Sequence, residues 1–232
     1  MFTPMWDDAA VPESILEVIA LTAADARAAA EGGADRIELV CDMHAQGLTP
    51  PVETYAAVRA AVDLPVRVML RTEAGYELSD APAVTEAARE LRAAGADEFV
   101  LGFLDTDGKV DVAAVRTVLA EIDGCRWTFH RALDHAGDRA AAWDAIAGLP
   151  GLDGVLTAGS PRGVEAGLGA LLSDATRTPP VLVGGGLRQQ HLAPLLDAGV
   201  RAFHTGSAVR AAGAWEAPVD PHLVRLWRGL LP

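Results

Sequence analysis

Five side chains capable of acid–base or anion-binding chemistry stand in or at the end of short β-rich runs of the sequence. They are two carboxylates, one guanidinium and two imidazoles: Glu17, Glu38, Arg71, His130 and His204. Carboxyl and imidazole groups transfer protons, and a guanidinium binds a carboxylate or phosphate through paired hydrogen bonds. This combination predicts a site for a small anionic ligand, with Glu17, Glu38, Arg71, His130 and His204 as candidate catalytic residues and His130 as general acid or base.

These residues share one parity of their runs, together with Arg67, Met69 and Thr128. Side chains alternate across a strand, so one parity faces the helices of a barrel and the other faces its interior or mouth. The opposite parity is apolar, as a helix-facing set should be: Leu16, Val18, Ile37, Leu39, Val68, Leu70, Trp127, Phe129 and Phe203. Buried charges are costly unless they pair or bind a ligand. The alternative to a ligand site is an internal ion-pair network of Glu17 and Glu38 with Arg67 and Arg71.

The elements that must position these residues form a repeating pattern. Eight β-rich runs each lead into a stretch with helical spacing, which predicts parallel strands joined by helices. The predicted strands are 15–19, 36–40, 66–71, 98–102, 126–130, 154–157, 181–184 and 201–205. Glycines before three of them, Gly33, Gly95 and Gly199, suit the left-handed residue that ends a helix.

Eight such units predict a single (β/α)8 TIM-type barrel domain over residues 1–232, with the barrel at about 15–210. An open, doubly wound sheet is the alternative. A C-terminal helical extension at about 215–232 carries Leu223, Leu226, Trp227 and Leu230 at helical spacing. We expect this apolar stripe to pack against the barrel or to form a homodimer contact.

Composition and charge exclude several classes of protein. With 19 Lys and Arg against 32 Asp and Glu, the formal charge is −13, which disfavours a nucleic-acid partner. No apolar run approaches the length of a membrane span, and the first residues do not resemble a signal peptide. Cys41 and Cys125 form no metal-binding spacing. We therefore expect a cytoplasmic protein with reduced cysteines.

Two glycine-containing loops follow the last two predicted strands. In barrels, loops in these positions often bind phosphate through backbone amides. The candidate anion-binding residues are Gly185, Gly186, Thr205, Gly206 and Ser207, with Arg210 as a possible source of charge. Asp134, four residues after His130, is expected either to orient that ring or to begin the next helix.

Several segments resemble the CutC copper homeostasis family in order and spacing over about residues 15–207. They are Leu16-Glu17-Val18, Gly33-Ala34-Asp35-Arg36-Ile37-Glu38-Leu39, Gly47-Leu48-Thr49-Pro50, Thr128-Phe129-His130-Arg131-Ala132-Leu133-Asp134, Leu156-Thr157-Ala158-Gly159 and Gly184-Gly185-Gly186. The resemblance implies a cytoplasmic (β/α)8 barrel that binds copper as ligand or cofactor.

The sequence departs from that family where sulfur ligands are expected. Ile19 and Val40 stand at positions where the family usually has cysteine, and Cys41 is displaced by one residue. The remaining candidate metal ligands are Cys41, Met69, His130 and His204, a harder set than copper(I) prefers. Two hypotheses stay open: a CutC-like copper protein, and an enzyme for a small phosphorylated or carboxylated metabolite.

Overall fold

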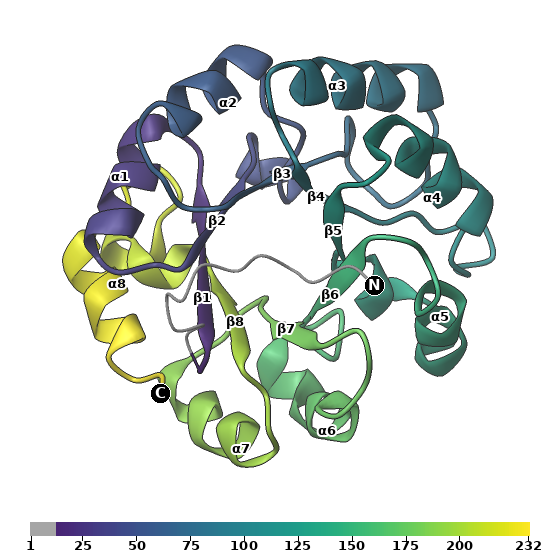
Figure 1. Ribbon diagram of the computed structural model, residues 1–232. Helices are drawn as coiled ribbons and strands as arrows, with labels where there is room; N and C mark the ends of the chain where they lie inside the picture. The colour runs from purple at the N-terminus through teal and green to yellow at the C-terminus, as the bar shows by residue number, and fades with distance from the viewer. Residues whose placement is uncertain (1–12) are drawn as a thin grey trace, which may run out of the picture.

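The computed structural model describes residues 13–232, which form a closed parallel barrel (Figure 1). Each strand pairs with the next, and β8 pairs with β1 through the register pair Glu17 and His204. The strands are β1 (Ile15–Ala20), β2 (Arg36–Leu39), β3 (Val66–Met69), β4 (Glu98–Leu101), β5 (Arg126–Phe129), β6 (Leu152–Thr157), β7 (Val181–Val183) and β8 (Ala202–Thr205). The predicted (β/α)8 barrel is confirmed, and the open sheet is wrong.

Helices surround the barrel on its outside (Figure 1). The α-helices are α1 (Ala23–Glu31), α2 (Val52–Arg59), α3 (Ala81–Ala93), α4 (Val112–Leu119), α5 (Arg139–Ile146), α6 (Val164–Asp174), α7 (Leu192–Asp197) and α8 (Pro221–Arg228). Short 3-10 helices are η1 (Met43–Ala45), η2 (Ala120–Ile122), η3 (Arg131–His135), η4 (Gln189–His191), η5 (Ser207–Val209) and η6 (Ala211–Gly213). Within residues 13–232, no helix has the length and apolar character that crossing a membrane requires.

Strands β3, β4, β5 and β7 end one or two residues earlier than the sequence predicts. Arg71, Gly102, His130 and Gly184 lie just beyond β3, β4, β5 and β7, at the carboxyl ends of the strands. Apolar character continues past the last ladder pair because the chain stays buried there: Leu70 is fully buried although β3 has ended. The side chains of Arg71 and His130 are therefore carried by loop residues at the barrel mouth.

The side chains of the apolar parity face outward, towards the helices, as predicted. Its nine members are all fully buried in the main hydrophobic core between strands and helices: Leu16, Val18, Ile37, Leu39, Val68, Leu70, Trp127, Phe129 and Phe203. The left-handed glycines are also confirmed, with φ of +89° at Gly33 and +96° at Gly199.

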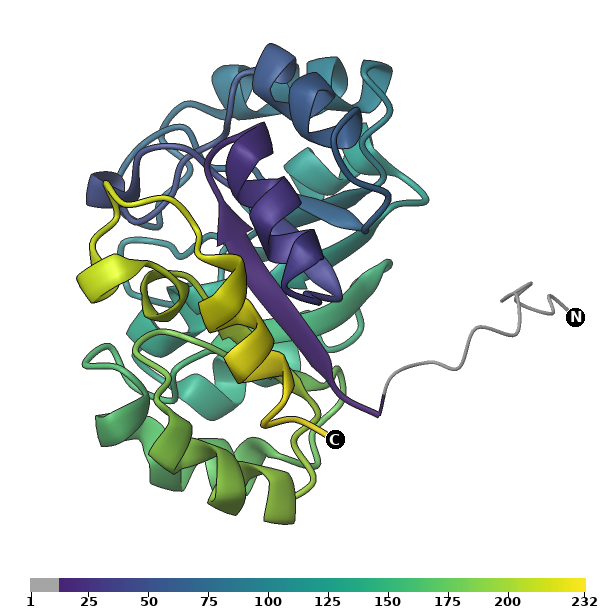
Figure 2. The same ribbon diagram turned by 90° about the vertical axis from the view of Figure 1, so that its left-hand side faces the viewer.

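The C-terminal helix α8 lies outside the barrel beside α1 (Figures 1 and 2). Val224 and Trp227 are buried, and a Cβ at Gly32 would overlap Val224, so this contact requires glycine at the end of α1. The predicted stripe only partly packs: Leu226 is 49% exposed and Leu230 is 44% exposed.

Candidate functional site

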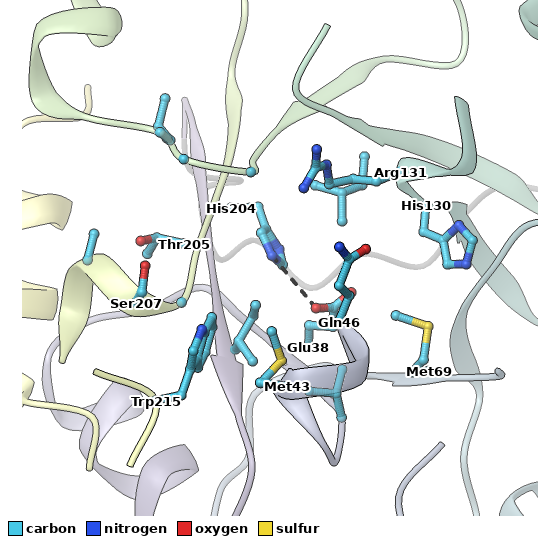
Figure 3. Close-up of a pocket in the computed structure, with 18 of the residues that line it drawn as sticks. Glu38, Met43, Gln46, Met69, His130, Arg131, His204, Thr205, Ser207 and Trp215 are labelled. Carbon is cyan, nitrogen blue, oxygen red and sulfur yellow. Dashed lines mark ion pairs between the residues drawn. The ribbon is translucent and has the colours of Figure 1, made fainter. Parts of the chain in front are cut away.

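Four ionisable side chains from β1, β2 and β8 form a series of ion pairs inside the barrel, in the order Arg36, Glu17, His204 and Glu38. Arg36 Nε lies 2.5 Å from Glu17 Oε2, and Glu17 Oε1 lies 2.8 Å from His204 Nδ1. His204 Nε2 is in turn 3.7 Å from Glu38 Oε2, the ion pair drawn in Figure 3. Glu17, Glu38 and His204 are all buried. Three of the predicted site residues are therefore brought together, and they come from strands that meet where the barrel closes.

The two carboxyls of this series have opposite pKa shifts. Burial opposes ionisation of Glu17, yet the Arg36 guanidinium and His204 hold its pKa well below the usual range. Burial and, to a smaller extent, the charge on Glu17 raise the pKa of Glu38 to about 7, although the attraction of His204 opposes this shift. Burial lowers the pKa of His204, but Glu38 and Glu17 outweigh it, so the net shift is upward. Glu17 is thus a fixed anion, whereas Glu38 can gain or lose a proton near neutral pH.

His130 begins the loop after β5 and caps η3. Its Nδ1 accepts a hydrogen bond of 3.2 Å from the backbone N–H of Ala132. Burial, followed by the charge of Arg71, lowers the pKa of His130 to about 3, so the ring is neutral at neutral pH. Because Nδ1 accepts, the hydrogen-bond pattern assigns the ring proton to Nε2. That Nε2 is buried and has no hydrogen-bond partner among the described residues.

Arg71 fastens the loop that follows β2. Its Nη2 donates to the carbonyl oxygens of Ala45 at 2.8 Å, Gln46 at 2.7 Å and Gly47 at 2.7 Å. Asp42 and Gln46 are non-glycine residues with positive φ, 45° and 64°, a conformation that costs free energy and needs support from its surroundings. Arg71 therefore lines the mouth, but most of its N–H groups donate hydrogen bonds to backbone carbonyls.

The interior ion-pair network predicted as the alternative has different partners. Arg67 Nε binds Glu98 Oε2 at 2.9 Å, its Nη2 binds Asp153 Oδ2 at 2.6 Å, and its Nη1 donates to the Thr128 hydroxyl. Within residues 13–232, Arg71 makes no ion pair. No salt bridge joins Glu17 or Glu38 to Arg67 or Arg71 in the described part of the chain, so the predicted pairing is wrong. Arg67 is in register with both Glu38 and Glu98, but its side chain binds Glu98 and Asp153.

Both predictions for Asp134 are also wrong. Asp138, not Asp134, caps α5, and Asp134 does not contact His130. Its carboxylate binds Arg131 Nε at 2.9 Å, Arg139 Nη1 at 3.2 Å and the backbone N–H of Ala158 at 2.9 Å. Asp134 thus holds Arg131 at the edge of the mouth.

The predicted anion-binding loops do line the mouth, although most of their glycines make room for protein side chains. A Cβ at Gly185 would meet the Arg131 guanidinium, and one at Gly206 would meet the Trp215 ring. Gly186 differs, since it has a φ of +82° and its Cβ position faces open space. Arg210 cannot supply charge here, because it is buried and binds Asp25 Oδ2 at 2.9 Å.

These groups surround a cavity of about 290 Å³ at the carboxyl ends of the strands (Figure 3). Its lining contains four of the five predicted catalytic residues, Glu38, Arg71, His130 and His204, and the five anion-loop candidates Gly185, Gly186, Thr205, Gly206 and Ser207. Glu17 lies below the cavity and reaches it through His204. Met69 lines the cavity, but Cys41 does not; its thiol donates to the carbonyl of Thr49.

Sequence reasoning missed several lining residues, namely Met43, Gln46, Tyr76, Arg131 and Trp215. Arg131 follows His130 directly and could have been found from its position after β5. Gln46 and Tyr76 join across the mouth, with the Tyr76 hydroxyl 3.2 Å from Gln46 Oε1. Trp215 lies beyond the repeat, so no periodicity pointed to it.

Fold and site together define a class of protein: a (β/α)8 barrel with a polar cavity at the carboxyl ends of its strands, the place where barrels of this kind carry their active sites. Comparison with known proteins narrows the class. The model of the CutC family matches residues 14–209. The chain therefore belongs to the CutC family, as its resemblance predicted.

Individual relatives agree with this assignment. The family protein CutC of Klebsiella pneumoniae strain 342 is 35% identical over 207 residues, 87% of this chain and 81% of that protein. The crystal structure of CutC from Streptococcus agalactiae has a TM-score of 0.75 at 21% identity, covering 83% and 98% of the two chains. Thiamine phosphate pyrophosphorylase from Pyrococcus furiosus has a TM-score of 0.60 at 20% identity, covering 95% and 98%. These two structural likenesses concern the fold alone.

Proposed function

We propose that this chain is an enzyme that transfers a proton to or from a small phosphorylated or carboxylated metabolite held in the barrel mouth. The observation that carries the proposal is the state of Glu38. Its Oε1 is buried and has no hydrogen-bond partner among residues 13–232, its carboxyl lines the cavity, and its pKa is raised to about 7. A general base or acid works best when its pKa is near the working pH. Structural stability alone does not account for a carboxyl kept in that state.

Each neighbour has a distinct role in this proposal. Glu38 exchanges the proton, and His204 beside it stabilises the ionised carboxylate. Glu17 fixes the orientation of His204 and is itself neutralised by Arg36. His130, neutral with its proton on Nε2, is a hydrogen-bond donor for a substrate oxygen rather than a base. This revises the general acid–base role that its sequence position suggested.

Charge at the mouth favours an anionic substrate. Arg71 and Arg131 both line the cavity, whereas the chain as a whole carries −13. Asp134 offsets Arg131, and Asp174 offsets Arg139, which also binds Asp134. Arg71 lines the cavity without a carboxylate at salt-bridge distance among residues 13–232, so it supplies positive charge at the mouth. The open space at Gly186, beside Arg131, suits the phosphate or carboxylate group. Thr205, Gly206 and Ser207 complete the anion-binding set.

The test is a screen of the purified chain against small phosphorylated and carboxylated metabolites in D2O, followed by NMR. Deuterium incorporation, cleavage and hydrolysis would all be visible in the same spectra. We expect at least one compound to react with the wild type and not with Glu38→Gln. A reaction that proceeds equally well in Glu38→Gln would overturn the role of Glu38.

Copper binding is the second candidate function. The observation in its favour is that the thioethers of Met43 and Met69 line the same cavity as His130. The name of the Streptococcus agalactiae relative also refers to copper homeostasis. Against it, Cys41 is outside the cavity lining, and both nitrogens of His204 face carboxylates. The donor set therefore fits copper(I) poorly.

A copper(I) titration of the reduced protein against a chelator of known affinity separates the two candidates. We expect no competition with the chelator by the wild type. The double variant Ile19→Cys with Val40→Cys supplies two thiols at cavity-lining positions and should compete strongly, since copper(I) prefers sulfur ligands. Tight one-to-one binding by the wild type would restore the copper function.

Location and assembly are part of the same proposal. We place the protein in the cytoplasm, supported by its unpaired Cys41 and Cys125. We also propose a homodimer through two exposed leucines, Leu226 in α8 and Leu230 just after it. Cell fractionation tests the first. Sedimentation of wild type and Leu226→Glu tests the second, because a dimer through α8 should dissociate in the variant.

A further inference from the structure

One side of the cavity is apolar. It is formed by Ile19, Val40, Met43 and Trp215, which we call the apolar wall. Figure 3 shows Met43 and Trp215 on the side of the cavity away from Arg131 and His130. Ile19 lies in β1 and Val40 directly follows β2. Met43 begins η1, and Trp215 lies between η6 and α8. The cavity therefore has two sides of different chemistry.

The apolar wall is separate from the core that stabilises the barrel. Ile19, Val40, Met69 and Val100 form a second hydrophobic cluster, against which Met43 and Trp215 pack. The main core lies on the other face of the strands. A second cluster inside the mouth adds apolar surface where a polar substrate would find no partner, so it needs an explanation beyond folding.

Trp215 is held in a fixed position within this wall. The guanidinium of Arg210 lies 5.4 Å from the centre of its ring, and Arg210 is itself anchored to Asp25. Gly206 has no side chain where the Trp215 ring lies, and a Cβ there would overlap the ring. A fixed aromatic ring offers a flat contact surface that loses little side-chain freedom when a ligand binds.

The size of the cavity limits the ligand. A volume of about 290 Å³ corresponds to about ten water molecules at 30 Å³ each. There is space for one anionic group near Arg131 and Gly186 and for one ring or short branched chain against the apolar wall.

We propose that the substrate is a small amphipathic anion, whose phosphate or carboxylate is bound by Arg131 and the loops after β7 and β8 and whose flat apolar part packs on the apolar wall. This inference rests on the proposed function, because it assumes that the cavity binds an anionic metabolite. It adds that the rest of the molecule is apolar rather than a polyhydroxylated chain.

The test compares phenyl phosphate with inorganic phosphate by calorimetric titration of the full chain. We expect phenyl phosphate to bind at least about tenfold more tightly, because its ring leaves water on binding. Trp215→Ala should remove most of this advantage and leave the dissociation constant of inorganic phosphate unchanged. Arg131→Gln should weaken both probes by a similar factor.

The variant Met43→Ser removes a different side chain of the apolar wall and is used if Trp215→Ala does not fold. Because Met43 is only half-buried, this substitution should leave the fold intact. Circular dichroism of each variant checks the fold. Equal binding of the two probes by the wild type overturns this inference alone. An advantage of phenyl phosphate that survives both wall variants also overturns it. Failure of both probes to bind would instead contradict the proposed anionic substrate.

Discussion

Two layers of charged side chains fill the inside of this barrel, and they differ in how completely they satisfy one another. In the lower layer, all three nitrogens of Arg67 have partners: Glu98, Thr128 and Asp153. In the upper layer, Glu38 Oε1 and His130 Nε2 are buried and have no hydrogen-bond partner among the described residues. Asp153 Oδ1 is the exception in the lower layer, and its other oxygen binds Arg67.

The difference indicates what each layer is for. A buried charge whose hydrogen bonds are complete costs little to keep and cannot easily bind anything else. A buried polar atom without a partner destabilises the protein, and a ligand can supply the missing interaction. The lower layer therefore fits a role in stability, and the upper layer fits the ligand binding and proton transfer that we propose. Removal of the buried Glu38 carboxylate should raise stability, whereas removal of Arg67 should lower it.

The largest effect is expected in the lower layer. Arg67→Met should lower the free energy of unfolding by about 3 to 5 kcal/mol, because it leaves Glu98 and Asp153 without their buried cation. Urea denaturation measures the change. Arg126→Met is the matched control: Arg126 also pairs with Glu98 but is 47% exposed, so its loss should cost about 1 kcal/mol or less. Equal losses in both variants would contradict a structural lower layer.

A smaller effect of opposite sign is expected in the upper layer. Glu38→Gln should raise the free energy of unfolding by about 1 to 3 kcal/mol at pH 8, because it removes a desolvated carboxylate. In the wild type, the pKa of the Glu38 carboxyl is higher in the folded protein than in the unfolded chain. The free energy of unfolding of the wild type therefore falls as the pH rises from about 4.5 to about 7. The gain from Glu38→Gln should therefore shrink towards pH 4.5.

Glu17→Gln is the control for this prediction. The pKa of Glu17 is lowered on folding, so its stabilisation is present above its ordinary value of 4.5 and is lost as the pH falls through the lower folded value. The variant should destabilise the protein at pH 8, where Arg36 and His204 lose a partner. Destabilisation by Glu38→Gln as well would show that the upper layer, too, is built for stability.

The smallest effect on stability is expected at His130. His130→Ala removes the cap of η3 and should lower the free energy of unfolding by about 1 kcal/mol, while binding of phenyl phosphate falls below detection. Denaturation and calorimetry on the same preparation measure both quantities. Unchanged binding would show that the substrate binds elsewhere in the mouth. An unfolded variant would show that His130 is needed for stability.

The sequence predicted the barrel and the inward-facing residues because both follow from periodicity. Alternation assigned Glu17, Glu38 and His204 to the interior, and the register of β1, β2 and β8 brings them together. Which charges pair was not predictable, because a pair depends on side-chain conformation as well as on strand register: Arg67 is in register with both Glu38 and Glu98 but binds only Glu98. Loop residues were also missed, since the positions of Gln46 and Trp215 depend on turns that have no period.

The closing contact between β1 and β8 also affects how the protein is made. Glu17 meets Arg36 after a further 19 residues, but His204 follows 187 residues later. At about 5 to 20 residues per second, a ribosome needs roughly 10 to 40 s to synthesise that interval. Until then Glu17 has its arginine but no imidazole, and the seam of the barrel stays open. The ion-pair chain of Arg36, Glu17, His204 and Glu38 is therefore among the last parts of the molecule to assemble, and a polypeptide released before β8 would lack it.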